Sequence, residues 1–451
     1  MHSTLSSSGW WTRPASSRSL AAVVVAALAV MAVAFAVELA LRTPGDIERS
    51  DLRVYQPYGS AIVSGEVPYR DFSLEYPPGA LPMFVLPAAF VRVRGSTDQA
   101  TWDQLNSPAK RYYHAFNLLV ILLTGAAVVV TALTLAACRR PARNVVLALG
   151  VVALSPLLLG DVFPGRFDIW PALIVAAGLA AGVHGRYRLG AVALGLGAAT
   201  KLYPALLIPC LAIVAVRHRG VREGVLALVT AVGTAAAVFA PFAIESFSGT
   251  WSALRVQFQG GLQIETLAGS LLVNASHLEQ KLQGLGFPPP SSLTNRAIET
   301  GIQRSVLVGS GVDATATAMS VLLALAVLAL YVQLARSGAG PRESLIRSSA
   351  AVVAATLVLG DVLSPQYLIW LVPLVPLVGG RRGVTATGFF ALAAVLTHFW
   401  FPSGYREYEN GLGAEPARLL LARNLALLAL WVVLILPRRP SANGQRYAET
   451  V

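Results

Sequence analysis

Residues 20–41 read LAAVVVAALAVMAVAFAVELAL, an unbroken apolar run of 22 residues with Glu38 as its only charged member. A helix needs about 20 mostly apolar residues to cross the hydrocarbon core of a bilayer. Arg13 and Arg18 precede the run, which places its N-terminal end in the cytoplasm by the positive-inside rule. The run exceeds the apolar core of a cleaved signal peptide, about 7–15 residues. We therefore interpret it as the first of several membrane spans.

The composition of the whole chain agrees with this interpretation. Of its 451 residues, 55% are hydrophobic and 13% are charged, and the mean hydropathy is +0.61. A soluble protein of this size could not cover so much apolar surface, so the composition predicts an all-α, polytopic membrane protein. The net charge of +12 does not indicate nucleic-acid binding, because many arginines lie in short turns between apolar segments, where they set orientation. The two cysteines are far apart in apolar runs, which predicts no disulfide.

Alternation across the membrane predicts about twelve spans in a single domain of residues 20–437. They are 20–41, 111–138, 144–160, 167–184, 189–200, 203–216, 222–242, 312–336, 347–361, 366–380, 383–401 and 418–437. The tails 1–19 and 438–451 are then both cytoplasmic, and residues 42–110 and 243–311 form outer loops.

Two segments of this topology leave alternatives. Residues 80–93 are apolar but short and contain two prolines, so we expect an interfacial helix rather than a crossing. Residues 189–216 form either one helix or two short segments that turn at residues 201–204. The two-segment topology is preferred, because only then do the arginines on both sides fall in the cytoplasm.

Acidic and tyrosine residues gather near the outer face, which indicates that the protein acts there. Asp51 begins the stretch Asp51-Leu-Arg-Val-Tyr55, about ten residues beyond the first span, and residues 65–69 and 76–79 add tyrosines and prolines. A carboxylate at the membrane surface can act as general base on a sugar hydroxyl of a lipid-linked substrate. The structural alternative is that Asp51 caps a short interfacial helix.

Cations at two other predicted outer turns are candidate phosphate ligands. Arg166 lies in the turn that ends at Asp168, and could bind a phosphate through its two-pronged guanidinium or form an ion pair with Asp168. Lys201, one of three lysines in the chain, is the only charged residue between Leu189 and Val216. An ionisable group within an apolar segment is costly and usually functional, although it could also snorkel to the interface.

The remaining candidates are weaker. His277 in the second outer loop could contact phosphate or could be a structural histidine, and Gln366 and Tyr367 offer hydrogen bonds at a further outer turn. The histidines and cysteines show no metal-binding spacing, and the sequence has no P-loop or dinucleotide-binding motif.

These motifs resemble the GT-C superfamily of membrane glycosyltransferases, and within it family 87 (DUF2029-type), the polyprenol-phosphate-mannose-dependent mannosyltransferases. The resemblance rests on the order of six motifs, at residues 51–55, 65–69, 75–78, 165–168, 199–204 and 364–367. It implies that substrate is contacted by motif residues Arg53, Tyr55, Tyr69, Glu75, Tyr76, Asp168, Tyr203, Gln366 and Tyr367. One departure is Gly165-Arg-Phe-Asp168, where many members carry Gly-Gln-x-Asn.

The resemblance also implies an activity and a place for it. The donor would be a sugar on polyprenyl phosphate, mannose in most of the family, and the acceptor a glycolipid or glycan of the cell envelope. Transfer would occur at the outer face of the bacterial cytoplasmic membrane. Asp51 would act as general base with inversion at the sugar, Lys201, Arg166 and His277 would bind the donor phosphate, and no metal, cofactor or nucleic acid would take part. Arabinose or glucose remains open as the sugar.

A secondary transporter or a flippase for lipid-linked sugars is the alternative function. Twelve spans suit that class as well. Transporters, however, usually carry polar residues near the middle of the membrane on broken helices. Here the polar clusters lie at the outer ends of the spans, and Glu38 is the main exception.

Overall fold

The computed structural model describes residues 14–42, 50–91, 108–257, 261–284, 296–300, 305–309 and 311–436. Apart from one two-stranded hairpin, its regular structure is helical, which confirms the predicted all-α class. Residues 1–13 of the predicted N-terminal tail and the whole predicted C-terminal tail, residues 438–451, lie outside the described residues.

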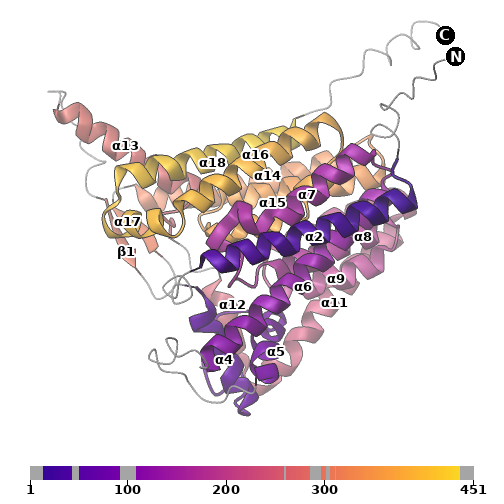
Figure 1. Ribbon diagram of the computed structural model, residues 1–451, viewed down its shortest axis with the longest axis horizontal. Helices are drawn as coiled ribbons and strands as arrows, with labels where there is room; N and C mark the ends of the chain where they lie inside the picture. Colours follow the sequence, from indigo (N-terminus) through magenta and orange to yellow (C-terminus); the bar gives the residue numbers. More distant parts are fainter. Residues whose placement is uncertain are drawn as a thin grey trace, which may run out of the picture.

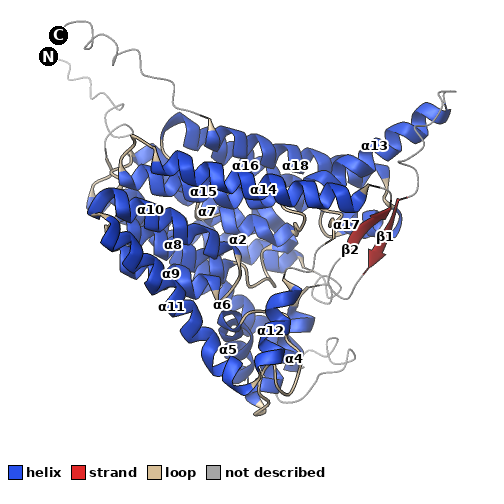
Figure 2. Cartoon of the chain, turned by 180° about the vertical axis from the view of Figure 1, so that it is seen from behind, coloured by secondary structure: helices blue, strands red, loops and turns tan. Residues whose placement is uncertain are grey.

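Seven helices in the described part of the chain are long and apolar enough to cross a membrane, so this is a multi-pass membrane protein. They are α2 (Ser17–Leu41), α6 (Pro108–Ala137), α7 (Ala142–Leu159), α11 (Val221–Glu245), α14 (Val312–Ala335), α16 (Gly380–Trp400) and α18 (Ala414–Ile435). In both views these helices lie side by side as one bundle (Figures 1 and 2).

The other predicted spans coincide with helical segments that are shorter or less apolar than these seven. These are α8 (Ile169–Val183), α9 (Tyr187–Ala198), α10 (Ile208–Arg219), α15 (Pro341–Leu359) and the 3₁₀ helices η5 (Pro365–Leu371) and η6 (Val375–Leu377). Helix α15 packs against α8, α10, α14 and α18, and most of its residues are buried. The predicted span 366–380 is not one continuous helix, because Pro365, Pro373 and Pro376 cannot donate the backbone hydrogen bonds that an α-helix requires.

The two-segment interpretation of residues 189–216 is confirmed. Helix α9 ends at Ala198, and the 3₁₀ helix η4 (Tyr203–Leu207) leads into α10. Pro204 and Pro209 occupy the first turns of these two segments, where proline is tolerated. The break between α9 and η4 contains Lys201, and the chain reverses direction there.

The remaining elements, most of them short, cover one end of the bundle. They are α4 (Leu52–Val63), η1 (Pro78–Ala80), α5 (Leu81–Val91), η3 (Gly160–Val162), α12 (Phe247–Val256), α13 (Leu267–Gly284), α17 (Ser403–Gly411) and the antiparallel strands β1 (Arg296–Thr300) and β2 (Ser305–Gly309). In Figure 1 α4 and α12 lie in the lower part of the molecule, and β1, α13 and α17 lie at its left edge. Helix α5 corresponds to the segment expected at the interface, residues 80–93.

Candidate active site

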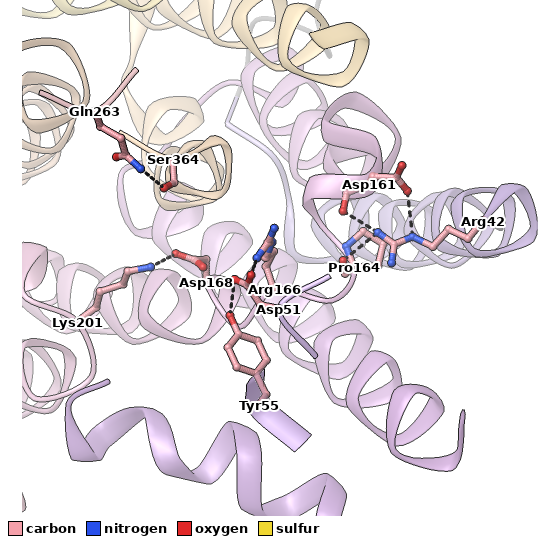
Figure 3. A network of polar contacts seen from close by, with 10 residues as sticks. All are labelled: Arg42, Asp51, Tyr55, Asp161, Pro164, Arg166, Asp168, Lys201, Gln263 and Ser364. Carbon is pink, nitrogen blue, oxygen red and sulfur yellow. Dashed lines mark hydrogen bonds and ion pairs between the residues drawn. The ribbon is translucent and has the colours of Figure 1, made fainter. Parts of the chain in front are cut away.

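Asp51 lies directly before helix α4, at the position of a helix cap, but its side chain makes no capping hydrogen bond. Its backbone carbonyl accepts the first bonds of the helix instead, from the N–H groups of Val54 and Tyr55. The carboxylate accepts a hydrogen bond of 3.0 Å from the Tyr55 hydroxyl and forms an ion pair with Arg166 (Figure 3). The side chain of Asp51 therefore points toward Tyr55 and Arg166 and does not cap the helix.

The turn between α7 and α8 supplies two charged side chains that point to different partners. Gly165 has a φ of +82°, which favours glycine, and the turn places Arg166 against Asp51. Asp168, whose side chain is 1% exposed, accepts a 2.5 Å hydrogen bond from Lys201 and a 2.7 Å bond from the Trp370 indole. The alternative of an ion pair between Arg166 and Asp168 is thus not what the structure contains.

Lys201 is held by aromatic rings as well as by Asp168. Its ammonium lies 4.9 Å from the centre of the Phe167 ring, 4.8 Å from that of Tyr367 and 5.1 Å from that of Trp370. A ring face attracts a cation, most strongly away from water. Tyr203 stacks on Trp370 at 4.1 Å, which keeps the cage rigid. The ammonium is therefore fixed in place before any substrate arrives.

A cavity of about 190 Å³ lies beside this ammonium, and we call it the Lys201 cavity. Its polar lining comes from five separate parts of the chain: Asp51, Glu75, Tyr76, Thr200, Lys201, Gln257, Gln263, Ser364, Gln366 and Tyr367. Two contacts hold these parts together, because Gly79 N–H donates to the Ala199 carbonyl (2.7 Å) and the Gln257 side chain donates to the Glu75 carbonyl (2.7 Å).

A second cavity, of about 350 Å³, adjoins the first, and we call it the Glu265 cavity. Asp51, Gln263, Ser364 and Gln366 line both cavities. The second cavity also has Arg166, Glu265, Phe401, Pro402, Tyr405, Arg406 and Glu409 in its wall. Gln263 lies on the shared boundary, where it accepts a hydrogen bond from the Leu363 N–H (2.8 Å). Asp51 is the one carboxylate that borders both spaces among the described residues.

Burial changes the acid–base properties of three groups outside the spans. It lowers the pKa of the Arg166 guanidinium to about 10, which leaves it charged at neutral pH. It also lowers the pKa of Lys201, and the nearby Asp168 carboxylate opposes this effect. Burial raises the pKa of Glu265 to about 8, against the attraction of Arg423 and Arg166. At neutral pH the Glu265 cavity thus contains a carboxyl group that is mostly protonated.

Arg42, at the end of α2, holds the turn that carries Arg166. Its guanidinium, 2% exposed, donates hydrogen bonds to the carbonyls of Asp161 (2.6 Å) and Pro164 (2.9 Å). It also lies 3.3 Å from the Asp161 carboxylate. Charge-assisted bonds to two carbonyls of one turn fix its shape, so Arg42 positions the residues that contact Asp51 and Lys201.

The model of glycosyltransferase family 87 matches residues 74–360 of this chain. The chain belongs to glycosyltransferase family 87. The crystal structure of ArnT from Cupriavidus metallidurans bound to undecaprenyl phosphate is similar at 13% identity, with a TM-score of 0.44, over 93% of this chain and 77% of that chain. No curated protein matches the chain.

The matched segment of this family 87 member includes Glu75, Arg166, Asp168 and Lys201, whereas Asp51 and the turn at residues 364–367 lie outside it. The structure nevertheless brings both outlying parts to the Lys201 cavity. Assembly of the site thus depends on tertiary contacts beyond the matched segment.

Several tyrosines that were expected to contact substrate instead pack against or hydrogen-bond other residues of the site. Tyr55 is buried and stacks on Phe84 at 4.6 Å, with its hydroxyl directed to Asp51. The Tyr69 hydroxyl donates to the Tyr76 carbonyl at 2.7 Å. Tyr203 packs on Trp370 and lines neither cavity.

Two further predicted site residues lie away from both cavities, with no contact to Asp51 or Lys201 among the described interactions. Arg53 is exposed, whereas Tyr55 on the same helix is buried. His277, on α13, hydrogen-bonds the Leu412 carbonyl at 2.6 Å through Nε2, as a structural histidine would. The third phosphate candidate, Arg166, lines the Glu265 cavity and contacts Asp51, so Lys201 is the one cation of the three beside the first cavity.

The acidic side of the Glu265 cavity was not predicted from the sequence. Tyr405 and Glu409 lie one helical turn apart on α17, and the Tyr405 hydroxyl donates to Glu409 at 3.2 Å. The amphipathic pattern of residues 403–411, which places acids and tyrosines on one short helix, could have indicated this part of the site. Within the described ranges no group of three or more His, Cys, Asp or Glu side chains could hold a metal ion.

Proposed function

We propose that this protein is an inverting glycosyltransferase that moves a sugar, mannose, from polyprenyl phosphate to a hydroxyl of a cell-envelope glycolipid or glycan. The reaction would take place at the outer face of the bacterial cytoplasmic membrane, without metal or cofactor. One observation carries the proposal: Asp51 borders two adjoining cavities, of which one has a fixed cation and the other has carboxyl and hydroxyl groups. A transferase that joins two substrates needs this arrangement.

The Lys201 cavity suits the phosphate end of the donor. A phosphodiester carries negative charge, and more charge develops on its oxygen as the sugar–oxygen bond breaks. Lys201 is already oriented by Asp168 and three rings, so little reorganisation is needed at the moment of reaction. The polyprenyl chain would remain in the bilayer, next to the apolar helices.

The Glu265 cavity suits a hydroxyl-bearing acceptor. Carboxyl groups, a tyrosine hydroxyl and an aromatic ring such as that of Phe401 are typical partners for sugar hydroxyls and sugar rings. An acceptor hydroxyl directed from this cavity toward Asp51 would also face the donor sugar in the neighbouring cavity. Asp51 then receives the hydroxyl proton as the oxygen attacks the anomeric carbon, and the polyprenyl phosphate leaves with the bonding electron pair.

Arg166 and Tyr55 give Asp51 a defined orientation for this step. The ion pair and the 3.0 Å hydrogen bond each engage one of the two carboxylate oxygens. A positioned general base contributes about 10²–10⁴-fold to a rate. Arg166 is thus a positioning residue in this mechanism rather than a ligand of the donor phosphate.

The test is transfer by purified protein from radiolabelled polyprenyl-phosphate mannose to a lipid extract. We expect transfer by the wild type and about 10²–10⁴-fold less by Asp51→Asn. Asp71→Asn is the matched control, because Asp71 is an exposed carboxylate that pairs with Arg70. Equal rates for wild type and Asp51→Asn would refute the role of Asp51 as base.

The donor sugar and the enzyme class are tested in the same assay. If mannose is not transferred, the same comparison is made with polyprenyl-phosphate arabinose and glucose. Transfer of one of these would correct the sugar and leave the mechanism intact. Failure with all three, together with movement of a lipid-linked sugar across proteoliposomes, would favour the transporter or flippase alternative.

A further inference from the structure

A separate polar cavity lies at the other end of the bundle from the active site. Its volume is about 480 Å³, and it is formed where the ends of α6, α8, α9, α10 and α15 meet. Helix α8 starts beside Asp168 and ends in this cavity at Val183. Its 15 residues put about 22 Å between the two places. We call this space the basal cavity.

The basal cavity is strongly basic. Arg140, Arg219 and Arg342 line it together with His184 and His218, whereas Glu343 is the only acid among the described residues of its wall. Glu343 pairs with Arg140 at 2.9 Å. One carboxylate thus faces three guanidinium groups.

Two of the arginines have different surroundings. Arg342 donates to the carbonyls of Ala137 (2.6 Å) and Val183 (3.1 Å), so part of its donor capacity satisfies the ends of α6 and α8. In the described part of the chain no carboxylate forms an ion pair with Arg219, whose guanidinium lies 5.6 Å from the centre of the Tyr187 ring. The Tyr187 hydroxyl is itself hydrogen-bonded to His218 at 2.9 Å.

The backbone of Gly185 lies close to the Arg219 guanidinium. This glycine has a φ of +74°, and a Cβ at this position would lie 3.0 Å from a terminal guanidinium nitrogen of Arg219. The ring and the glycine backbone together hold the guanidinium at the cavity wall.

Orientation by the positive-inside rule explains why each of these turns contains arginine. It does not explain why arginines from three separate turns converge on one cavity.

We infer that the basal cavity binds a phosphate-bearing anion, with Arg219 and Arg342 as its principal ligands. Guanidinium groups match phosphate oxygens with two parallel hydrogen bonds, and several cations around one space favour a multiply charged anion. The volume falls within the range of small-molecule sites, about 300–1,000 Å³. The phosphate can belong to a soluble molecule or to the head group of an anionic lipid, which basic pockets between spans also bind. This inference does not depend on the proposed transferase activity.

The experiment uses the full-length protein in nanodiscs of phosphatidylcholine and measures binding of inorganic pyrophosphate by titration calorimetry. A second arm measures retention of phosphatidylglycerol by native mass spectrometry. The test variant is Arg219→Gln. The control is Arg188→Gln, which removes an equal charge from an exposed residue that pairs with Glu223 and does not line the cavity.

We expect Arg219→Gln to weaken binding at least about tenfold, because it removes roughly one charge-assisted interaction. Arg188→Gln should leave binding unchanged. An effect on pyrophosphate identifies a soluble phosphate ligand, and an effect on phosphatidylglycerol alone identifies a lipid head group. The inference is overturned if neither probe binds, or if both variants weaken binding equally, which would indicate general attraction to a basic surface. A wild-type unfolding temperature for Arg219→Gln confirms that the variant is folded.

Discussion

The role of Lys201 can be separated from its ion pair by a compensated pair of substitutions. Lys201→Gln removes the ammonium and leaves Asp168, 1% exposed, without its cation. Removal of one partner from a buried ion pair costs about 3–5 kcal/mol, mostly because the remaining charge is uncompensated. The single variant should therefore lose both stability and activity, and its activity alone would not reveal a role in phosphate binding.

The double variant Lys201→Gln with Asp168→Asn removes this ambiguity. The new amide side chain at position 168 would carry no charge, and its oxygen would still accept the hydrogen bond that the Trp370 indole now donates at 2.7 Å. We expect the unfolding temperature in detergent to return most of the way to that of the wild type. Sugar transfer should stay about 10²–10³-fold below wild type, the usual loss when one charge-stabilising group is removed.

The assays are thermal unfolding in detergent and initial rates with the donor concentration varied. Lys281→Gln, which removes an exposed lysine on α13, is the matched control and should change neither quantity. If the double variant recovers wild-type stability and also transfers sugar at close to the wild-type rate, Lys201 only neutralises Asp168. The proposed interaction with the donor phosphate would then be wrong.

Three further predictions concern residues that line the two cavities or pack against their walls. Arg42→Gln should lower kcat about 10²-fold, because it releases the turn at residues 161–164. Arg42→Lys should recover part of that loss. If the two variants transfer sugar at the same rate, Arg42 does not act by positioning this turn. Burial raises the pKa of Glu265 to about 8, so this carboxyl group should lose its proton as the pH rises through 8. The KM for the acceptor should therefore change over that pH range in the wild type. In Glu265→Gln the KM should not change with pH. Gly79→Ala should destabilise the protein, because the added Cβ would approach Thr200 Oγ1 to 2.5 Å; an unchanged unfolding temperature would contradict this close packing.

Much of the fold was predictable from local hydrophobicity. Helical segments occur at all twelve predicted positions, and the turn between α9 and η4 lies where Lys201 and Pro204 suggested. Transfer of a side chain from water to lipid depends mainly on that side chain, so a run such as residues 20–41 reveals its location without knowledge of its neighbours. The same argument fails at residues 366–380, where prolines replace one helix by two 3₁₀ helices.

The candidate site was predictable only in part. Asp51, Lys201 and Gln366 stand out because polar groups are rare next to apolar spans, and all three line the Lys201 cavity. Glu265 and Glu409 did not stand out, because each lies in a polar segment where an acid is ordinary. That both line one cavity depends on how α13, α17 and α18 pack.

The sequence by itself determined that this chain crosses a membrane many times, that its acids and tyrosines gather at one end, and that Asp51 and Lys201 are candidates for chemistry. Only the tertiary structure decided the partners: Arg166 pairs with Asp51, Asp168 pairs with Lys201, and His277 bonds a backbone carbonyl. The physical reason is that burial in lipid is a property of each segment alone. The energy of an ion pair depends on the distance between two groups and on their shared burial, which exist only once the helices have packed.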